Sequence, residues 1–309
     1  MIIGKKVKKP TLISESLQIE YRIEKEQAEF VKYLGEEEEY RVPAKIEGYP
    51  VVQIAPYAFA ERRNLYAVSL PEMVHTIGAH AFYNCRSLSS LSFHDRLEEI
   101  EDGAFKNCYQ LKHLTLQTES SHKMVLKNIL ADITEGISVT IYYKDEAKTE
   151  RAELVFPPYL VEYAENTPAR ILEKQAYGSG ERYRHCLYSG QLDFEQYDQL
   201  FDYSVAVDDI EYPVRCAVSR VRYPYALKEE NREHYEAFLQ SKMEKVLTYY
   251  IQREDADTLK WMLDTKRLSR DAMNEASELC RKYGKNSLLP LLVEYQNENF
   301  KPKKKSFSL

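Results

Sequence analysis

The stretch that decides the fold runs from Val74 to Phe93: Val-His-Thr-Ile-Gly-Ala-His-Ala-Phe-Tyr-Asn-Cys-Arg-Ser-Leu-Ser-Ser-Leu-Ser-Phe. Its pattern recurs with a 23-residue period, downstream over residues 97–116 and upstream over residues 51–70. Six apolar columns share this period, which indicates an internal repeat. The columns are Val51, Val74 and Leu97; Ile54, Ile77 and Ile100; Ala58-Phe59, Ala81-Phe82 and Ala104-Phe105; Leu65, Leu88 and Leu111; Val68, Leu91 and Leu114; Leu70, Phe93 and Leu116.

Each copy ends in the pattern L-x-x-L-x-L, which is typical of the strand of a leucine-rich repeat. These strands are expected at residues 65–70, 88–93 and 111–116. Alternation along a strand sends one set of side chains inward and the other set outward. The Ala-Phe pair belongs to the return leg of the coil, where phenylalanine fills the interior. Stacked coils then bury a continuous core that no single coil could bury alone.

The order Val-x-x-Ile-x-x-x-Ala-Phe-x-x-Cys-x-x-Leu-x-x-Leu-x-Leu resembles the BspA-type, or treponemal-type, leucine-rich repeat. Residues 74–93 match it with Phe93 in place of the last leucine, and residues 97–116 match it with Leu97 in place of the first valine. Residues 40–51 are similar to the hairpin that often precedes such repeats. The resemblance covers about residues 40–118. It implies a solenoid and a non-enzymatic interaction module, and many members of this family are exposed on cell surfaces.

Three coils are near the lower limit for a free-standing solenoid, so both ends need covers. Residues 17–23 alternate like a strand and residues 28–33 read as its partner, which predicts an N-terminal cap hairpin. After Gln117 the 23-residue period fails. Residues 139–143 and 152–156 then read as strands, either of a degenerate coil or of a capping sheet.

The back half of the chain reads as helical. Asp193 and Gln196 have the spacing of a capping box, and an apolar stripe with helical spacing predicts one long helix over residues 228–252. Gly284 is placed as a helix stop. Residues 257–296 distantly resemble the helical hairpins of ankyrin-type repeats, without their Thr-Pro-Leu-His signature.

These patterns predict an α+β chain. It consists of a short right-handed leucine-rich-repeat solenoid with an N-terminal cap hairpin, a mixed connector and an all-helical C-terminal domain. The predicted segments are the N-terminal tail and cap hairpin (1–39), the repeats (40–118), a mixed α/β connector or degenerate cap (119–190), the helical domain (191–298) and a basic tail (299–309).

Composition narrows the class of protein. The chain is 44% apolar and 30% charged, which allows a packed core, and it holds no apolar run near the ~18 residues of a membrane helix. A net charge of -6 argues against a dedicated nucleic-acid binder. Five cysteines without a CxxC pair suit reduced thiols in a cytosol. Because no apolar stretch follows the basic start, we expect no signal peptide and a cytoplasmic location.

Candidate chemistry is sparse, and we predict no catalytic residue, metal or cofactor. Asp255-Ala256-Asp257-Thr258 approximates the D-x-D-x-T nucleophile motif of a phosphatase, but it joins two helical stretches and reads as a loop and helix start. His75 and His80 lack the third ligand that zinc requires. Cys85 and Cys108 hold equivalent positions on adjacent coils, close enough to cross-link if oxidised; we expect two buried, reduced thiols.

The outward positions of the three repeat strands predict the function, a non-catalytic scaffold that binds a protein partner. An exported surface adhesin of the same family and an enzyme with a site in residues 118–250 are the alternatives. Along the stack these positions change from neutral to basic, which suits an extended or acidic protein partner. The predicted partner-binding residues are Tyr66, Ala67 and Ser69; Ser89, Ser90 and Ser92; Lys112, His113 and Thr115.

Overall fold

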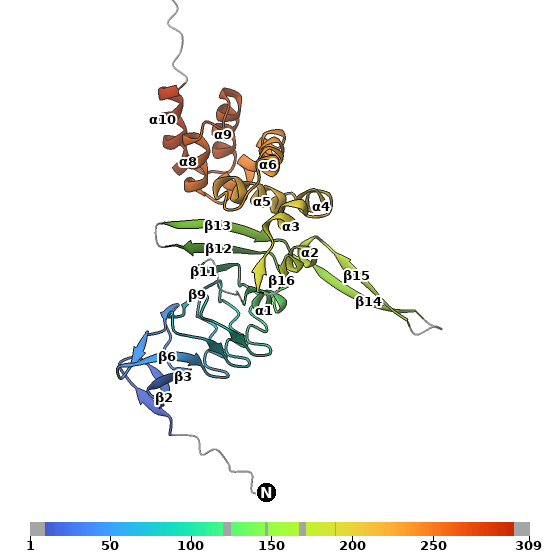
Figure 1. Ribbon diagram of the computed structural model, residues 1–309. Coiled ribbons are helices and arrows are strands. Elements are labelled where there is room, and N and C mark those ends of the chain that lie inside the picture. Colours follow the sequence, from blue (N-terminus) through green and yellow to red (C-terminus); the bar gives the residue numbers. More distant parts are fainter. Residues whose placement is uncertain (1–9, 120–124, 146–147, 167–170, 189, 300–309) are drawn as a thin grey trace, which may run out of the picture. The chain divides into compact units, whose positions relative to one another are not determined.

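A computed structural model describes residues 10–119, 125–145, 148–166, 171–188 and 190–299 (Figure 1). The first nine residues and the predicted basic tail beyond Asn299 lie outside the described residues. The chain forms two compact units. Met1–Asp208 with Tyr223–Leu227 make the N-terminal unit, and Asp209–Arg222 with Lys228–Leu309 make the helical unit.

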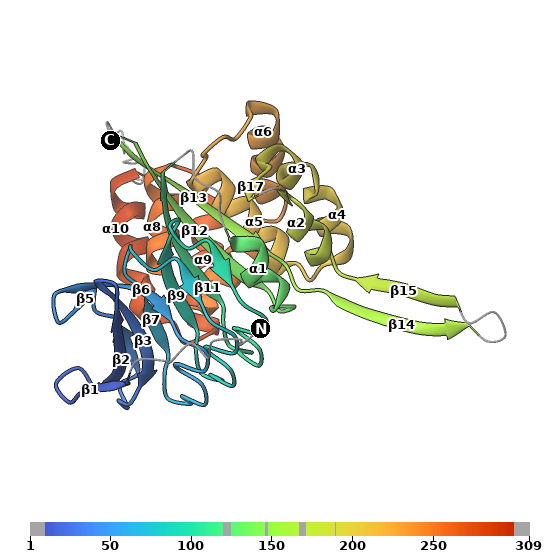
Figure 2. The ribbon, with the colours of Figure 1, turned by 60° about the horizontal axis from the view of Figure 1, so that its bottom comes forward.

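The N-terminal unit contains a β-solenoid of about five turns, and a helical region follows it in the chain, which confirms the predicted fold class. The strands of the solenoid turns form two sheets (Figure 2). Along the first sheet, the order is β1 (Leu12–Ser14), β2 (Ile19–Glu24), β3 (Gln27–Tyr33), β6 (Tyr49–Ile54, also paired with β5, Lys45–Ile46), β8 (Thr76–Ile77) and β10 (Glu99–Ile100). Along the second, it is β13 (Thr149–Phe156), β12 (Ile137–Lys144), β11 (His113–Glu119), β9 (Ser90–His94), β7 (Ala67–Ser69) and β4 (Glu39–Arg41).

The predicted N-terminal cap hairpin is confirmed. Strands β2 and β3 pair antiparallel, from Ile19 opposite Tyr33 to Glu24 opposite Gln27. Strand β3 then pairs in parallel with β6, the first strand of the repeat, so that Phe30 lies beside Ile54. The hairpin therefore covers the end of the first coil with its own apolar side chains.

A column of phenylalanine rings runs through the solenoid core. Phe59 and Phe82 stack with ring centroids 4.9 Å apart, and Phe82 and Phe105 stack at 5.2 Å. Phe30 of the cap hairpin extends the column, because its ring stacks on Phe59 at 5.0 Å. All four rings are at most 1% exposed. The spacing of the rings follows the spacing of neighbouring strands, about 4.8 Å, so one ring per coil fills the interior.

Two turn positions in each of the three 23-residue coils adopt the left-handed backbone conformation. One column is Tyr57, His80 and Gly103, and the other is Glu61, Asn84 and Asn107, with φ between 58° and 67°. In the second column the side chains form a ladder, in which Asn84 Nδ2 donates to Glu61 Oε1 (2.6 Å) and Asn107 Nδ2 donates to Asn84 Oδ1 (2.8 Å). Asparagine tolerates this conformation better than most residues, and the ladder offsets part of its cost.

The second sheet continues past residue 118, where the predicted repeats end. Strand β12 pairs in parallel with β11 and keeps its register, with Val139 beside Leu114 and Ile141 beside Leu116. The short helix α1 (Leu126–Ala131) precedes β12 and buries Leu126, Ile129 and Leu130. Because α1 stands in this coil, the next strand falls outside the 23-residue period. Strand β13 then pairs antiparallel with β12 and ends the sheet.

Arg184 joins four segments behind this last coil. It lies in α2 (Gly180–His185) and is 6% exposed, and all five of its N–H groups donate to main-chain carbonyls. The acceptors are Leu130, Ile133, Glu135, Pro157 and Gly180, at 2.8–3.2 Å. Burial lowers the pKa of Arg184 to about 10, so the guanidinium is still charged at neutral pH.

The remaining part of the N-terminal unit contains both strands and helices. Strands β14 (Leu160–Asn166) and β15 (Ile171–Tyr177) form an antiparallel hairpin of their own, and β16 (Leu187–Tyr188) and β17 (Gln191–Leu192) form a second, shorter one. Helices α3 (Phe194–Gln199) and α4 (Phe201–Val207) follow. The capping box is confirmed in part, because the side chain of Asp193 accepts from the N–H of Gln196.

The helical unit contains α5 (Glu211–Arg222), α6 (Glu229–Ser241), α7 (Met243–Gln252), α8 (Ala256–Asp264), α9 (Arg270–Lys282) and α10 (Leu289–Asn299). The prediction of a single helix over 228–252 is wrong. The helix is interrupted at Lys242 (φ -117°), so α6 and α7 are separate. There the hydroxyl of Ser241 donates to the carbonyl of Phe238, a bond that competes with the helical ladder. Asp255 caps α8 through the N–H and hydroxyl of Thr258, which confirms the reading of that acidic motif as a helix start. Gly284 (φ +70°) follows the end of α9, as predicted.

Removal of one ring from the phenylalanine column is expected to destabilise the N-terminal unit. Phe82→Ala should lower the free energy of unfolding by about 3–5 kcal/mol, because the cavity lies between two rings that cannot approach each other. Urea titration followed by far-UV circular dichroism measures the change. Tyr188→Ala, at a side chain that is 79% exposed, is the control and should stay within about 0.5 kcal/mol of the wild type. An equal effect of the two substitutions would contradict the role given to the column.

Loss of the Arg184 guanidinium is expected to leave several buried carbonyls without a donor. Arg184→Met should therefore lower the free energy of unfolding by about 3 kcal/mol or more, and Arg184→Lys, with three donors, should fall between Met and wild type. The same urea titration applies. Arg63→Met is the control, since the Arg63 side chain is 70% exposed and its ion pair with Glu61 is 3.8 Å long.

Candidate partner-binding surface

The outward face of the second sheet carries two rows of mostly small side chains. Because side chains alternate along each strand, the inward residues are apolar or aromatic, and the outward ones lie side by side across the strands. The first row is Glu39, Ala67, Ser90, His113 and Ser138. The second row is Arg41, Ser69, Ser92, Thr115 and Thr140. We refer to these ten positions as the hydroxyl face.

The structure brings six of the predicted residues together on the hydroxyl face. Ala67, Ser69, Ser90, Ser92 and Thr115 are partly exposed there, and His113 is exposed. The other three precede the strands. Tyr66 is 51% exposed just before β7, whereas Ser89 is only 9% exposed and presents almost no surface. Lys112 precedes β11, and its ammonium group lies 3.9 Å from the carboxylate of Glu135.

Sequence reasoning missed the two ends of the hydroxyl face. Strand β4 adds Glu39 and Arg41, and β12 adds Ser138 and Thr140. Strand β4 carries no L-x-x-L-x-L pattern, and β12 is displaced from the 23-residue period by α1. The alternation of Ile137, Val139 and Ile141 was the available signal for β12, since it matches the inward leucines of β11.

A shallow depression of about 240 Å³ lies at the β4 end of the hydroxyl face. Strands β4, β7 and β9 line it, with Arg41, Ser69 and Ser92 among its residues. Its floor includes the buried side chain of Val68. Short hydroxyl side chains on neighbouring strands make this part of the sheet accessible to the side chains of another molecule.

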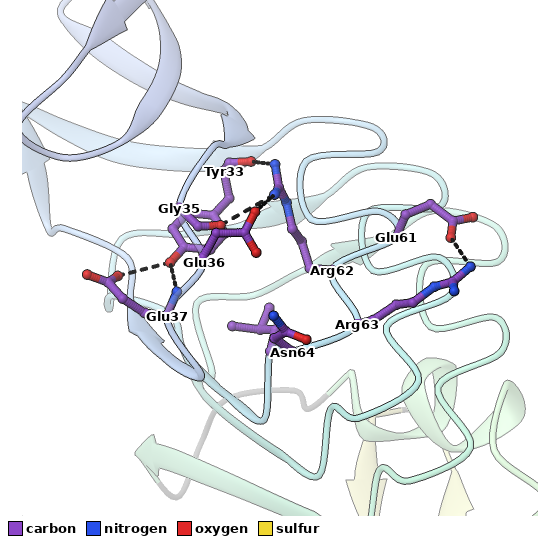
Figure 3. Close-up of a pocket in the computed structure, with 9 residues that line it drawn as sticks. Tyr33, Gly35, Glu36, Glu37, Glu61, Arg62, Arg63 and Asn64 are labelled. Carbon is purple, nitrogen blue, oxygen red and sulfur yellow. Dashed lines mark hydrogen bonds and ion pairs between the residues drawn. The ribbon is translucent and has the colours of Figure 1, made fainter.

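A second depression, of about 230 Å³, lies where the cap hairpin meets the first coil (Figure 3). Arg62 donates to the carbonyls of Tyr33 (2.5 Å) and Gly35 (3.3 Å), and the hydroxyl of Tyr33 donates to Glu37 (2.9 Å). Burial, together with the hydrogen bond to Glu37, raises the pKa of Tyr33 to about 12. These groups satisfy one another, so the network fastens the cap to the solenoid.

Arg62 occupies the same position of its coil as Cys85 and Cys108. Each of the three side chains donates to a main-chain carbonyl of the preceding layer. Cys85 Sγ donates to the carbonyl of Phe59 (3.0 Å), Cys108 Sγ donates to that of Phe82 (3.1 Å), and Arg62 reaches the hairpin. The longer side chain is needed in the first coil because the layer before it is a hairpin strand and not another coil.

Ser179, Ser204 and Asp208 form a compact cluster of chemistry-bearing groups within residues 118–250, the predicted region for an unrecognised enzyme site. Ser179 and Ser204 both donate to the carboxylate of Asp208, and the N–H of Ser179 also donates to it (2.8 Å). Both serines are fully buried. The cluster therefore ties the start of α2 to the end of α4, and its hydroxyl groups face no open surface. Among the described residues, no group of three or more His, Cys, Asp or Glu side chains is arranged to hold a metal.

Comparison with known proteins identifies the repeat region. A family model described as "BspA type Leucine rich repeat region" matches residues 49–144 in six copies. No curated protein matches the chain. Within the described part of the chain, no helix has both the length and the apolarity that a bilayer crossing requires.

Three solved structures are similar to part of the chain. A leucine-rich repeat protein of T. pallidum is 29% identical over 35% of this chain and 54% of its own length, with a TM-score of 0.32. A leucine-rich cell surface protein of Faecalibacterium prausnitzii is 22% identical over 38% of this chain and 41% of its own (TM-score 0.30). A leucine-rich repeat protein of Bacteroides capillosus is 27% identical over 36% and 88% (TM-score 0.32). The chain thus spans about half the length of the T. pallidum protein.

The two repeat thiols are free and buried, and they are expected to resist alkylation. Burial raises the pKa of the Cys85 thiol to about 12 and raises that of Cys108 as well. Since the thiolate is the nucleophile, iodoacetamide at pH 8.5 should modify native Cys85 about 1,000-fold more slowly than an exposed thiol, and readily after denaturation. Peptide mass spectrometry without reduction measures both states. A Cys85–Cys108 disulfide peptide from native protein would contradict the expectation.

The same shift predicts a pH dependence of stability. The native state holds the Cys85 proton more tightly than the unfolded chain, whose thiol titrates near 9.0. The stability that this thiol contributes is therefore complete below pH 9 and is lost as the pH rises from 9 toward 12. Cys85→Ala should remove this part of the alkaline loss, as measured by urea titration at pH 8 and pH 10.

Proposed function

We propose that this chain, whose residues 49–144 match a BspA-type leucine-rich repeat region, is a non-catalytic scaffold that binds a protein partner across its hydroxyl face. The repeat family supports an interaction or adhesin-like role. The observation that carries the proposal is the alignment of ten outward positions on five consecutive strands, with short side chains at seven of them. Serine and threonine hydroxyls both donate and accept, so such a face can pair with a partner's polar groups without large rearrangement.

Larger side chains border the small ones. Tyr66 stands beside the start of β7, while Tyr142 and Arg151 lie beside the second row at the β12 end, where the Arg151 guanidinium is 5.9 Å from the Tyr142 ring centroid. Exposed tyrosine offers contact area at low entropic cost, and arginine and tyrosine are enriched where binding energy concentrates. The small residues therefore form a floor with aromatic groups at its margins.

Two ion pairs border the hydroxyl face. Arg151 is 2.6 Å from Glu153, and Lys112 is 3.9 Å from Glu135. The basic end predicted from Lys112 is thus partly neutralised by a residue outside the repeats. We infer that a partner is recognised mainly by shape and hydrogen bonds, and that acidic character contributes less than the sequence indicates.

The width of the face indicates the size of the contact. Five strands, from β4 to β12, span about 19 Å at ~4.8 Å per strand. An extended segment of about six residues, rising ~3.3 Å per residue, covers that distance. The proposal is for an extended segment or sheet edge of the partner that crosses the repeat strands, with its action in the cytoplasm.

The substitution Ser92→Arg tests the surface. Ser92 lies in the centre of the second row and lines the depression, so a long charged side chain there should weaken partner binding at least tenfold. Thr76→Arg is the matched control, since Thr76 lies on β8 of the first sheet, between Gln53 of β6 and Glu99 of β10. The immobilised full chain captures proteins from a lysate of the encoding organism, and quantitative mass spectrometry compares the three forms.

A partner that wild type and Thr76→Arg retain but Ser92→Arg loses supports the proposal. The free energies of unfolding of both variants must lie within about 1 kcal/mol of the wild-type value. Retention of every wild-type partner by Ser92→Arg contradicts it. Cell fractionation separates the two interaction roles. A chain found only in the cytosol fits the scaffold, whereas a chain on the cell surface supports the adhesin.

A further inference from the structure

A separate groove lies wholly within the helical unit, where α6, α7 and α8 meet. Its volume is about 250 Å³. The floor is made of Leu239, Val246 and Met262, each at most 5% exposed, and the walls are Met243 and Trp261, which are partly exposed. Five apolar side chains from three helices thus converge on one opening. The N-terminal unit contributes no residue to it.

The wall residues are of the kinds that bind partners. Methionine is unbranched and adapts its shape to different ligands. Tryptophan and arginine are the side chains at which binding energy most often concentrates. Trp261 carries the guanidinium of Arg267 at 4.9 Å from its ring centroid and that of Arg222 at 5.8 Å, so two cations hold its ring in place.

The rim of the groove offers positive charge. Lys266 is exposed and makes no ion pair with any described residue. Arg267 uses only part of its donor set, because one terminal nitrogen donates to Glu236 (3.0 Å) while its buried Nε has no acceptor among the described residues. Glu236, whose side chain is 38% exposed, is therefore the acidic group with which an incoming carboxylate competes for the terminal nitrogens of Arg267.

The size of the groove selects the kind of ligand. Pockets for small molecules have volumes of about 300–1,000 Å³ and enclose most of the ligand. The groove is smaller and open, so it fits one or two apolar side chains of a larger molecule. An amphipathic helix presents such side chains at positions i, i+3 and i+4, with charged residues beside them.

We propose that the groove of α6, α7 and α8 is a second docking site, which takes an amphipathic helical segment of a protein partner with aliphatic anchors and acidic flanks. The anchors fill the space between Met243 and Trp261, and the acidic flanks meet Lys266 and Arg267. This site goes beyond the proposed function, because it belongs to the helical unit and shares no residue with the hydroxyl face. A chain with both sites connects two partners.

Trp261 is the only tryptophan of the chain, so its fluorescence reports directly on the groove. The probe is a synthetic amphipathic peptide of about four helical turns, with leucines at i, i+3, i+4 and i+7 and glutamates elsewhere. A second peptide has the same leucines and lysines in place of the glutamates. Titrated into the full chain, the acidic peptide should change Trp261 emission and bind at least tenfold more tightly than the basic one.

Three substitutions sharpen the test. Met243→Glu should weaken the acidic peptide at least tenfold, whereas Met243→Leu should keep its binding, which separates groove contact from a general effect on folding. Lys266→Glu should reduce the preference for the acidic peptide at least threefold, and Lys260→Glu, at an exposed position of α8 outside the groove, should leave it unchanged. Ser92→Arg should bind both peptides as wild type does, so the failure of one site is distinguishable from the failure of the other.

Equal binding of the two peptides would overturn the proposal. So would the absence of any change in Trp261 emission up to about 1 mM acidic peptide. So would binding that survives Met243→Glu, as followed independently by calorimetry. Analytical ultracentrifugation tests whether a second copy of the chain occupies the groove instead. Self-association of the wild type that Met243→Glu abolishes would assign the groove to a second copy of the chain and would contradict the proposal.

Discussion

The solenoid depends on stacking between layers, because no coil of this chain can bury its own apolar side chains. The phenylalanine column shows this constraint, because each ring is covered by a ring of the neighbouring layer. Its members are Phe30, Phe59, Phe82 and Phe105. The main chain follows the same rule, because each repeat strand completes its hydrogen bonds with the strands beside it. The side-by-side alignment of the outward residues on the hydroxyl face is a consequence, because neighbouring coils keep the same register from strand to strand.

The ends of the stack need other chemistry. At the first coil, the cap hairpin supplies Phe30, and Arg62 reaches carbonyls that a cysteine could not. At the last coil, Arg184 places one buried cation among five carbonyls, while Tyr197 uses its hydroxyl to bond the N–H and the carbonyl of Val155 on the edge strand β13. Both ends thus replace the missing neighbour with long polar side chains that satisfy main-chain groups.

The repeat core and its inward residues could be predicted from the sequence because they depend on contacts one period apart. The columns of Ile54, Phe59 and Leu65 needed only the 23-residue interval. Residues 139–143 could be predicted as a strand, but the parallel, in-register pairing of β12 with β11 could not, because the coil that contains α1 does not keep the 23-residue interval. The break at Lys242 also escaped it, because apolar spacing continues across a change in main-chain direction. Most of the carbonyls that accept from Arg184 lie 27–54 residues away along the sequence, so no local sequence pattern predicts these hydrogen bonds.

For the candidate surfaces, alternation was enough to find the positions but not their accessibility. It placed Ser90, Ser92 and Thr115 correctly on the outward side of their strands, whereas the burial of Ser89 and the ion pair of Lys112 with Glu135 depend on neighbours outside the pattern. The groove around Trp261 was not predicted, because its residues come from three helices whose packing the apolar stripe leaves open.

Layered growth has a consequence for how such a chain diversifies. An internal coil packs against another coil on either side. The cap hairpin contacts only the first coil, and the hydrogen bonds of Arg184 reach only the segments around the last coil. Duplication of one 23-residue stretch would therefore add a strand of ~4.8 Å to the middle of the ladder while both termini of the stack stayed unchanged. The sheet that carries the hydroxyl face can therefore gain or lose whole strands while the structures that cover its two ends remain the same.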